Sequence, residues 1–253
     1  MPPTTPVLDP FADVMKVPLF TSGGMQSSRY AVMLDPQGQN FEAGIVSGDY
    51  QLVPNQNVCD IATDVLDRTG LTYDESKQLF DGRKFQQRWI IPELQAEPEV
   101  GDIVQVAVDV YNSYDGSTTF GLAFNAQRLV CSNGMVLDFM LGGFRFKHYG
   151  NEHFQEELTQ AASRIRELGS RMIHLTNSLR KMINTPIHRE DIQESFRQLN
   201  LPKTYISDVY MALNGDDLWA LYNAYTDVLT KQESFRAENW NRQVSRRFIP
   251  SLN

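Results

Sequence analysis

Residues 101–151 read GDIVQVAVDVYNSYDGSTTFGLAFNAQRLVCSNGMVLDFMLGGFRFKHYGN, and this stretch sets the expected fold class. Ile103 to Val110 is rich in β-branched side chains, which favour strands. Asp115-Gly116 is a dipeptide that joins antiparallel strands, and Thr118 to Val130 supplies the returning strand. We therefore expect a β-hairpin at the centre of an antiparallel sheet.

The same stretch continues into a second turn and a basic segment. Asn133 and Gly134 tolerate left-handed backbone, so the chain turns there. It then either begins a short helix over Met135 to Leu141 or enters a loop. The next segment carries three basic side chains, namely Arg145, Lys147 and His148.

Ahead of this hairpin we expect a flexible arm, short strands and one helix. Residues 1–27 are rich in Pro and Gly and are predicted to form the arm. Turn residues divide the segment after the arm into strands, and Asn57 caps a helix that Gly70 ends. The expected elements are strands within 29–53, a helix over 57–69, strands over 71–80 and 83–91, and an acidic surface loop over 92–98.

The remainder of the chain has the pattern of helices. Apolar side chains recur every three or four residues from Phe154 to Ile183, which predicts a helix of about thirty residues that ends before Pro186. Shorter helices are expected over 189–199, 207–213 and 217–231. The predicted class is α+β, with a mainly antiparallel sheet core domain at 28–150 and a helical region at 151–253 that packs on the core or joins subunits.

Composition places the chain among folded proteins without a disulfide framework. Of 253 residues, 42% are hydrophobic and 21% are charged, as is ordinary for a globular domain. The first residues lack a basic start and an apolar core, and no later run approaches the roughly 18 apolar residues of a membrane span. The two cysteines are Cys59 and Cys131, which fit a reducing compartment. We expect a cytoplasmic protein that does not bind membranes.

The charge is uneven along the chain. Residues 1–125 hold 7 basic and 17 acidic side chains, residues 126–189 hold 9 and 5, and residues 190–253 hold 7 and 9. The corresponding net charges are -10, +4 and -2, which sum to the total of -8. The basic middle third indicates an anionic partner, unless these charges only pair along a solvated helix face.

Catalytic and cofactor sites compete with simpler roles for the same residues. Cys131 with His148 has the residue types of a nucleophile and its base, but a buried Cys at a strand end also serves as a small hydrophobe. His148 and His153 lack the spacing of a zinc motif, and no phosphate-binding Gly-rich loop with its Lys is present.

The carboxylates Asp102, Asp109 and Asp115 are the candidates for a magnesium site, although Asp115 is already explained as a turn former. We therefore expect no metal and no cofactor, and a binding protein rather than an enzyme.

Cations and aromatic side chains interleave in the central strands, as single-stranded nucleic acid requires. Cations follow the phosphates, and flat side chains stack on the bases. Trp89 and Tyr114 are the predicted stacking platforms. The predicted phosphate contacts are Arg83, Lys84, Arg88, Arg128, Arg145, Lys147 and His148. The simpler interpretation is that the aromatic side chains form the core and the cations lie on an ordinary surface.

Six segments, in order, resemble the phage- and plasmid-associated domain-of-unknown-function family numbered 932. They are GDYQLVPNQN, FDGRKFQQRWIIPE, NSYDGSTTF, QRLVCSNGM, KHYGN and LWALYNAYTDVLT, and the likeness covers about Ser28 to Thr230. Its most specific part is Arg128 through Asn133 followed by Lys147-His148. The resemblance implies a protein of a phage or mobile element in the cytoplasm of a bacterial host, and it implies no particular activity.

The predicted order of elements favours one function. The expected order is the helix over 57–69, a meander of three antiparallel strands and then the long helix. At the level of topology this order is similar to single-strand annealing recombinases of the RecT, Erf and Red-beta kind. We therefore expect an ATP-independent, homo-oligomeric protein that binds and anneals single-stranded DNA. The alternatives are a phage module that sequesters a host protein, and an enzyme that uses Cys131 and His148 or the carboxylates.

Overall fold

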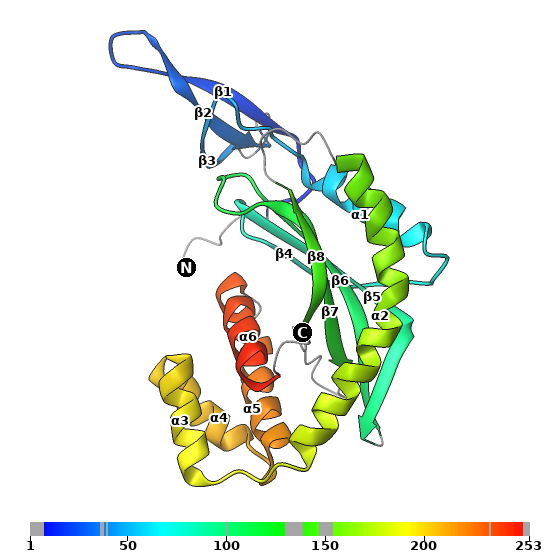
Figure 1. The fold of residues 1–253 in the computed structure, drawn as a ribbon. Coiled ribbons are helices and arrows are strands. Elements are labelled where there is room, and N and C mark those ends of the chain that lie inside the picture. The colour runs from blue at the N-terminus through cyan, green and yellow to red at the C-terminus, as the bar shows by residue number, and fades with distance from the viewer. Residues whose placement is uncertain are drawn as a thin grey trace.

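The structure, a computed structural model, describes residues 8–35, 38, 40–99, 101–129, 139–146, 154–232 and 234–249. The strands are β1 (Val14–Phe20), β2 (Gln26–Leu34), β3 (Phe41–Ser47), β4 (Asp74–Phe80), β5 (Lys84–Glu99), β6 (Asp102–Ser113), β7 (Phe120–Leu129) and β8 (Phe139–Phe146). The helices are α1 (Asn55–Asp67), α2 (Phe154–Ile183), α3 (Arg189–Leu199), α4 (Lys203–Ala212), α5 (Leu218–Thr230) and α6 (Phe235–Phe248). The predicted α+β class is confirmed, with most of the helices in the C-terminal half (Figure 1).

The first three strands form a separate antiparallel sheet in the order β1-β2-β3. The prediction of a flexible arm over residues 1–27 is wrong for its second half, because β1 and the start of β2 lie there. Pro18 suggests an irregular segment, but β1 is an edge strand, where a residue without a backbone N–H is tolerated. This sheet extends away from the rest of the molecule in Figure 1.

The other five strands form a meander in the order β4-β5-β6-β7-β8, and all neighbours are antiparallel. The predicted hairpin is β6 and β7, which Asp115 and Gly116 connect. The acidic loop expected over 92–98 is instead part of β5. Its two prolines fit because the register between β5 and β6 shifts between Ile91 and Gln95 and again between Ala96 and Glu99.

The last strand of the meander is not among the predicted elements. Residues 139–146 form β8, which pairs with β7, so the end of the short helix considered over Met135 to Leu141 is strand instead. The turn at Asn133 and Gly134 lies outside the described residues.

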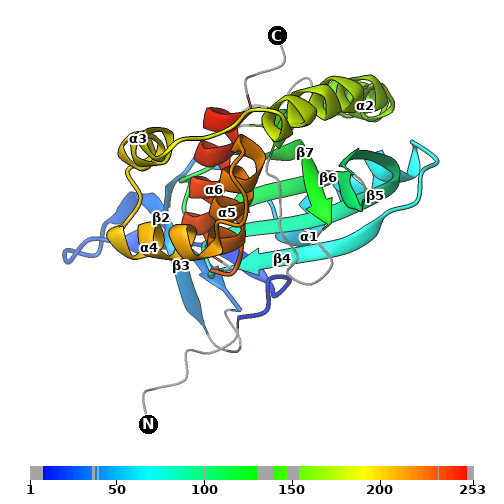
Figure 2. The ribbon, with the colours of Figure 1, turned by 90° about the horizontal axis from the view of Figure 1, so that it is seen from below.

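The five-stranded sheet has one apolar and one polar face. Side chains of one face, such as Phe85, Val110 and Phe124, belong to the main hydrophobic core together with residues of α1 and α2. The opposite face carries Arg88 and Asp109 and lies under α6. Figures 1 and 2 show α1 and α2 on one side of this sheet and α5 with α6 on the other.

The helical half matches the predicted pattern except at its end. The long helix α2 ends at Ile183, before Pro186, and α3 has the predicted bounds. Helix α6 is a further element that was not predicted. Its apolar side chains Ala237, Val244 and Phe248 are buried. Glu238 and Asn241 are buried as well, although polar side chains of this kind are usually exposed. None of the described helices combines the length and the apolar character needed to span a membrane.

Tyr50 and Tyr114 join the two sheets. The Tyr50 hydroxyl donates to the Ser113 carbonyl at 2.6 Å, and the backbone N–H of Asn55 donates to the Tyr114 hydroxyl at 3.0 Å. The backbones also approach closely at Gly44, where an added Cβ would lie 2.7 Å from the Cα of Asp115. Gly44 is therefore required by the close packing of β3 against the β6–β7 turn.

Burial of two acidic groups near this joint predicts a loss of stability in alkali. Burial raises the pKa of Cys59 from 9.0 to about 12, with smaller contributions from Asp60 and Glu75, and burial raises the pKa of Tyr114 from 10.0 to about 12. A group that stays protonated in the fold contributes stability below the pKa of the unfolded chain, and this contribution is lost as pH rises toward the folded pKa. We expect the urea midpoint to fall between about pH 9 and about pH 11.

The variant Cys59→Ala tests the cause of this fall. Removing the thiol should make the decline in the urea midpoint over this pH range shallower than in the unchanged protein, with Thr63→Ala on the same helix as the control. An unaltered slope in Cys59→Ala would contradict the assignment to this group.

Candidate nucleic-acid interface

An ion pair lies at the centre of the polar face. Arg88 on β5 faces Asp109 on β6, and its Nε and one Nη atom donate to the two carboxylate oxygens at 2.5 and 2.6 Å. Both side chains have 0% exposure. Charges removed from water in this way need paired, hydrogen-bonded partners, and the two-bond geometry provides them.

Asp109 also accepts hydrogen bonds from two further side chains of the same face. The Tyr111 hydroxyl donates at 2.8 Å and the Asn125 amide nitrogen at 2.6 Å, both to Oδ2. These hydrogen bonds to Asp109, which is itself held by Arg88, keep Tyr111 and Asn125 at defined positions on β6 and β7. A rigid polar platform of three adjacent strands results.

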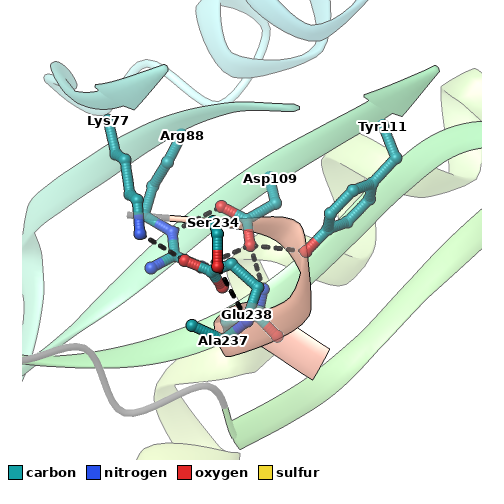
Figure 3. Close-up of polar contacts among 8 residues, drawn as sticks. Lys77, Arg88, Asp109, Tyr111, Ser234, Ala237 and Glu238 are labelled. Atoms are coloured by element: carbon teal, nitrogen blue, oxygen red, sulfur yellow. Dashed lines mark hydrogen bonds and ion pairs between the residues drawn. The ribbon is translucent and has the colours of Figure 1, made fainter. Parts of the chain in front are cut away.

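Helix α6 covers this platform mainly through polar contacts. Lys77 on β4 forms an ion pair with Glu238, whose carboxylate is buried, and the guanidinium carbon of Arg242 lies 4.7 Å from the centre of the Tyr111 ring. Ser234 caps the helix by accepting a hydrogen bond from the Ala237 N–H at 3.2 Å. Figure 3 shows the side chains of Lys77, Arg88 and Asp109 gathered around Glu238.

Two adjoining cavities open between the sheet and α6. The first, of about 680 Å³, is lined by Lys84, Arg236 and the β4–β5 turn, and the second, of about 490 Å³, by Asn125, Arg145 and small residues of β7 and β8. Both are also lined by Tyr111, Thr118 and Arg242, so they lie next to each other on the two sides of these side chains. We call the two cavities together the α6 groove.

The lining of the α6 groove carries more positive than negative charge. Its cations are Lys84, Arg145, Arg236 and Arg242, and its carboxylates are Asp81 and Glu238. Asp81 accepts hydrogen bonds from the backbone N–H groups of its own turn, and Glu238 is paired with Lys77. The groove is therefore a positive region on a protein whose net charge is -8.

Three of the predicted contact residues lie in the interior. Arg88 is paired with Asp109, while Trp89 and Tyr114 are only 2% and 1% exposed. Trp89 packs in the main core, and Tyr114 packs in the core of the β1–β3 sheet. We correct the predicted interface accordingly, since in this fold these three side chains cannot reach a nucleic acid.

The other predicted residues fall into three groups. Lys84 and Arg145 line the α6 groove, and Arg83 is exposed in the turn before β5. Arg128 lies on β7 opposite Val104, but its side chain is not among those described. Lys147 and His148 lie outside the described residues, as do Cys131, Asn133 and Gly134.

The β6–β7 turn has the geometry that its sequence indicates. Gly116 has a φ of 71°, and the Asp115 carboxylate accepts a hydrogen bond from the Ser117 N–H at 2.9 Å. Asp115 and Gly116 therefore shape the backbone, and the neighbouring Ser117 and Thr118 reach the groove.

Arg236 and Arg242 are the cations of the groove that the sequence-based prediction missed. Both belong to α6, which is not among the predicted helices. The sequence did contain a signal for this helix. Ser234 is a preferred N-cap, and an amphipathic run with Arg236 and three further arginines follows it.

A family model described as a domain of unknown function, DUF932, matches residues 42–248. The chain belongs to the DUF932 family. No curated protein and no solved structure matches it, so the topology-level likeness to annealing recombinases stays a prediction.

The described part of this DUF932 protein contains no group of three potential metal ligands. Asp109, one of the carboxylates considered for magnesium, is held by Arg88, Tyr111 and Asn125 instead. The side chain of Asp102 is not described, and the proposed pair of Cys131 and His148 lies outside the described residues. The catalytic interpretation therefore gains no support from the geometry of Asp109.

Asp109→Ala should destabilise this DUF932 protein strongly, because it leaves the buried Arg88 without its carboxylate. We expect a loss of about 3–5 kcal/mol in the free energy of unfolding, measured by urea denaturation. The double variant Arg88→Met/Asp109→Leu should lose less, since neither member of the pair is left as a buried charge without its partner. A loss below about 1 kcal/mol in Asp109→Ala would show that the pair is not the organising contact.

Proposed function

We propose that this protein binds and anneals single-stranded DNA without ATP, as a homo-oligomer, and that it serves a phage or mobile element. The observation that supports this most is the α6 groove, where Lys84, Arg145, Arg236 and Arg242 converge on a protein of net charge -8. Cations gathered on one side of an acidic protein attract a polyanion to that side. A single strand suits this arrangement better than a duplex does, because the groove is bounded by a helix on one side and by the sheet on the other.

The composition of the groove also fits a single strand. Tyr111 presents an aromatic ring between the two cavities, and the hydroxyls of Ser117 and Thr118 lie at the end of the groove that the β6–β7 turn forms. Phosphates pair with the cations, and exposed bases find aromatic and small side chains, so affinity does not require a particular sequence. The helix–meander–helix order of α1, β4–β8 and α2 agrees with the annealing part of the proposal.

Binding should be salt-dependent and should require the groove arginines. For Arg145→Ala/Arg242→Ala we expect at least about a tenfold weaker affinity for a fluorescent single-stranded oligonucleotide at low salt, and a slope of log affinity against log salt that is shallower by about 1.4. The matched control is Arg68→Ala/Lys231→Ala, which removes two exposed cations from the ends of α1 and α5.

Three results would contradict the proposal. They are no binding by the unchanged protein at low salt, binding that ignores salt, or an equal loss in the control variant. Annealing is then measured as strand pairing of complementary oligonucleotides without ATP.

A second observation favours the alternative function, a module that holds a host protein. The β1–β3 sheet exposes Met15 and Ile45, and Phe20 and Met25 near the β1–β2 turn are 62% and 71% exposed. Exposed apolar side chains gathered in this way mark protein contact surfaces.

This alternative predicts a defined complex with one host protein that survives size-exclusion chromatography. Met15→Lys/Ile45→Lys should abolish the complex, whereas Arg145→Ala/Arg242→Ala and added oligonucleotide should leave it intact. A complex that the arginine variant disrupts would instead point to the groove.

A further inference from the structure

The second cavity of the α6 groove has a floor of unusually small side chains. Gly121 and Ala123 on β7 lie beside Gly143 on β8, and all three line the cavity. Their neighbours on the same face are the large side chains Tyr111 and Arg145. A flat recess of about 490 Å³ results, within the range of pockets that hold single small molecules.

The walls of this recess carry cations and no carboxylate among the described lining residues. Arg145 stands across from Gly121 on the neighbouring strand, and Arg242 approaches from α6 over the Tyr111 ring. Two guanidinium groups at one opening suit a phosphate, which each can bind through paired hydrogen bonds.

Asn125 adds a polar group inside the recess. Its side chain lines the cavity, is 5% exposed, and donates through Nδ2 to the Asp109 carboxylate at 2.6 Å. Because a carboxylate only accepts, the amide must present its nitrogen to Asp109, and this fixes the opposite position as the carbonyl oxygen. The contact with Asp109 engages only the amide nitrogen, so the carbonyl oxygen is the acceptor that Asn125 can offer to a ligand in the recess.

We propose that this recess holds one nucleotide of the bound strand. The base lies on the floor of Gly121, Ala123 and Gly143, a donor on its edge meets the Asn125 carbonyl oxygen, and its phosphate lies between Arg145 and Arg242. This inference rests on the proposed function and adds a base-binding pocket to it. The affinity of the protein for a strand should then depend on the bases and not only on the charge of the phosphates.

The test compares a short single-stranded oligonucleotide with the same backbone carrying abasic sites. We expect the unchanged protein to bind the normal strand at least about fivefold more tightly, since the abasic strand cannot form the hydrogen bond to Asn125 or the contact with the floor. Ala123→Leu fills the floor without removing a charge, and should bind both strands with the affinity that the unchanged protein shows for the abasic strand. Ala123→Ser keeps the recess open and should retain the difference.

Each remaining outcome decides the inference. Equal binding of both strands by the unchanged protein overturns it, and so does an Ala123→Leu variant that still distinguishes them. Salt-dependent binding of the abasic strand keeps the proposed function even when the pocket fails, whereas the absence of binding to either strand rejects both. If circular dichroism shows that Ala123→Leu is unfolded, Ala123→Val replaces it, and the same loss of discrimination is expected.

Discussion

The ion pair of Arg88 and Asp109 is the constraint on which the arrangement of this molecule depends. Two opposite charges at the middle of a sheet cannot be left against an apolar layer, so the face that carries them needs a polar cover. Helix α6 provides it with Glu238 and Asn241, while its apolar residues Val244 and Phe248 belong to the main hydrophobic core. The covering helix therefore has to be amphipathic in an uncommon sense, since its polar side is buried as well as its apolar side.

The two faces of the five-stranded sheet thus perform different tasks. On one face, α1 and α2 bury aliphatic and aromatic side chains, which supplies most of the apolar burial of the sheet. On the other face, hydrogen bonds and charges replace hydrophobic packing, and the cover is incomplete around Tyr111. The α6 groove lies where α6 no longer covers the polar face. The polar side chains that line it have fixed positions, because hydrogen bonds already hold the platform beneath it rigid.

Much of the fold could be predicted from local signals, while the site could be predicted only in part. Asp115-Gly116 and the apolar repeat of α2 act over short distances in the sequence, so the hairpin and the long helix were predicted correctly. Arg88 shows the limit, because no sequence pattern reveals that its partner is Asp109 and that both are buried. Helix α6 shows it again, since Glu238 resembles a surface residue until the sheet that buries it is known.

The contact between Lys77 and Glu238 joins residues 161 positions apart. The strands of the meander, by contrast, pair with their neighbours in sequence and can form early, since local contacts close with little loss of chain entropy. During synthesis the N-terminal segments emerge and fold first, and α6 leaves the ribosome after the strands that it covers. The groove therefore forms only after the sheet beneath it, and a chain that lacks α6 presents the bare polar face of the sheet instead.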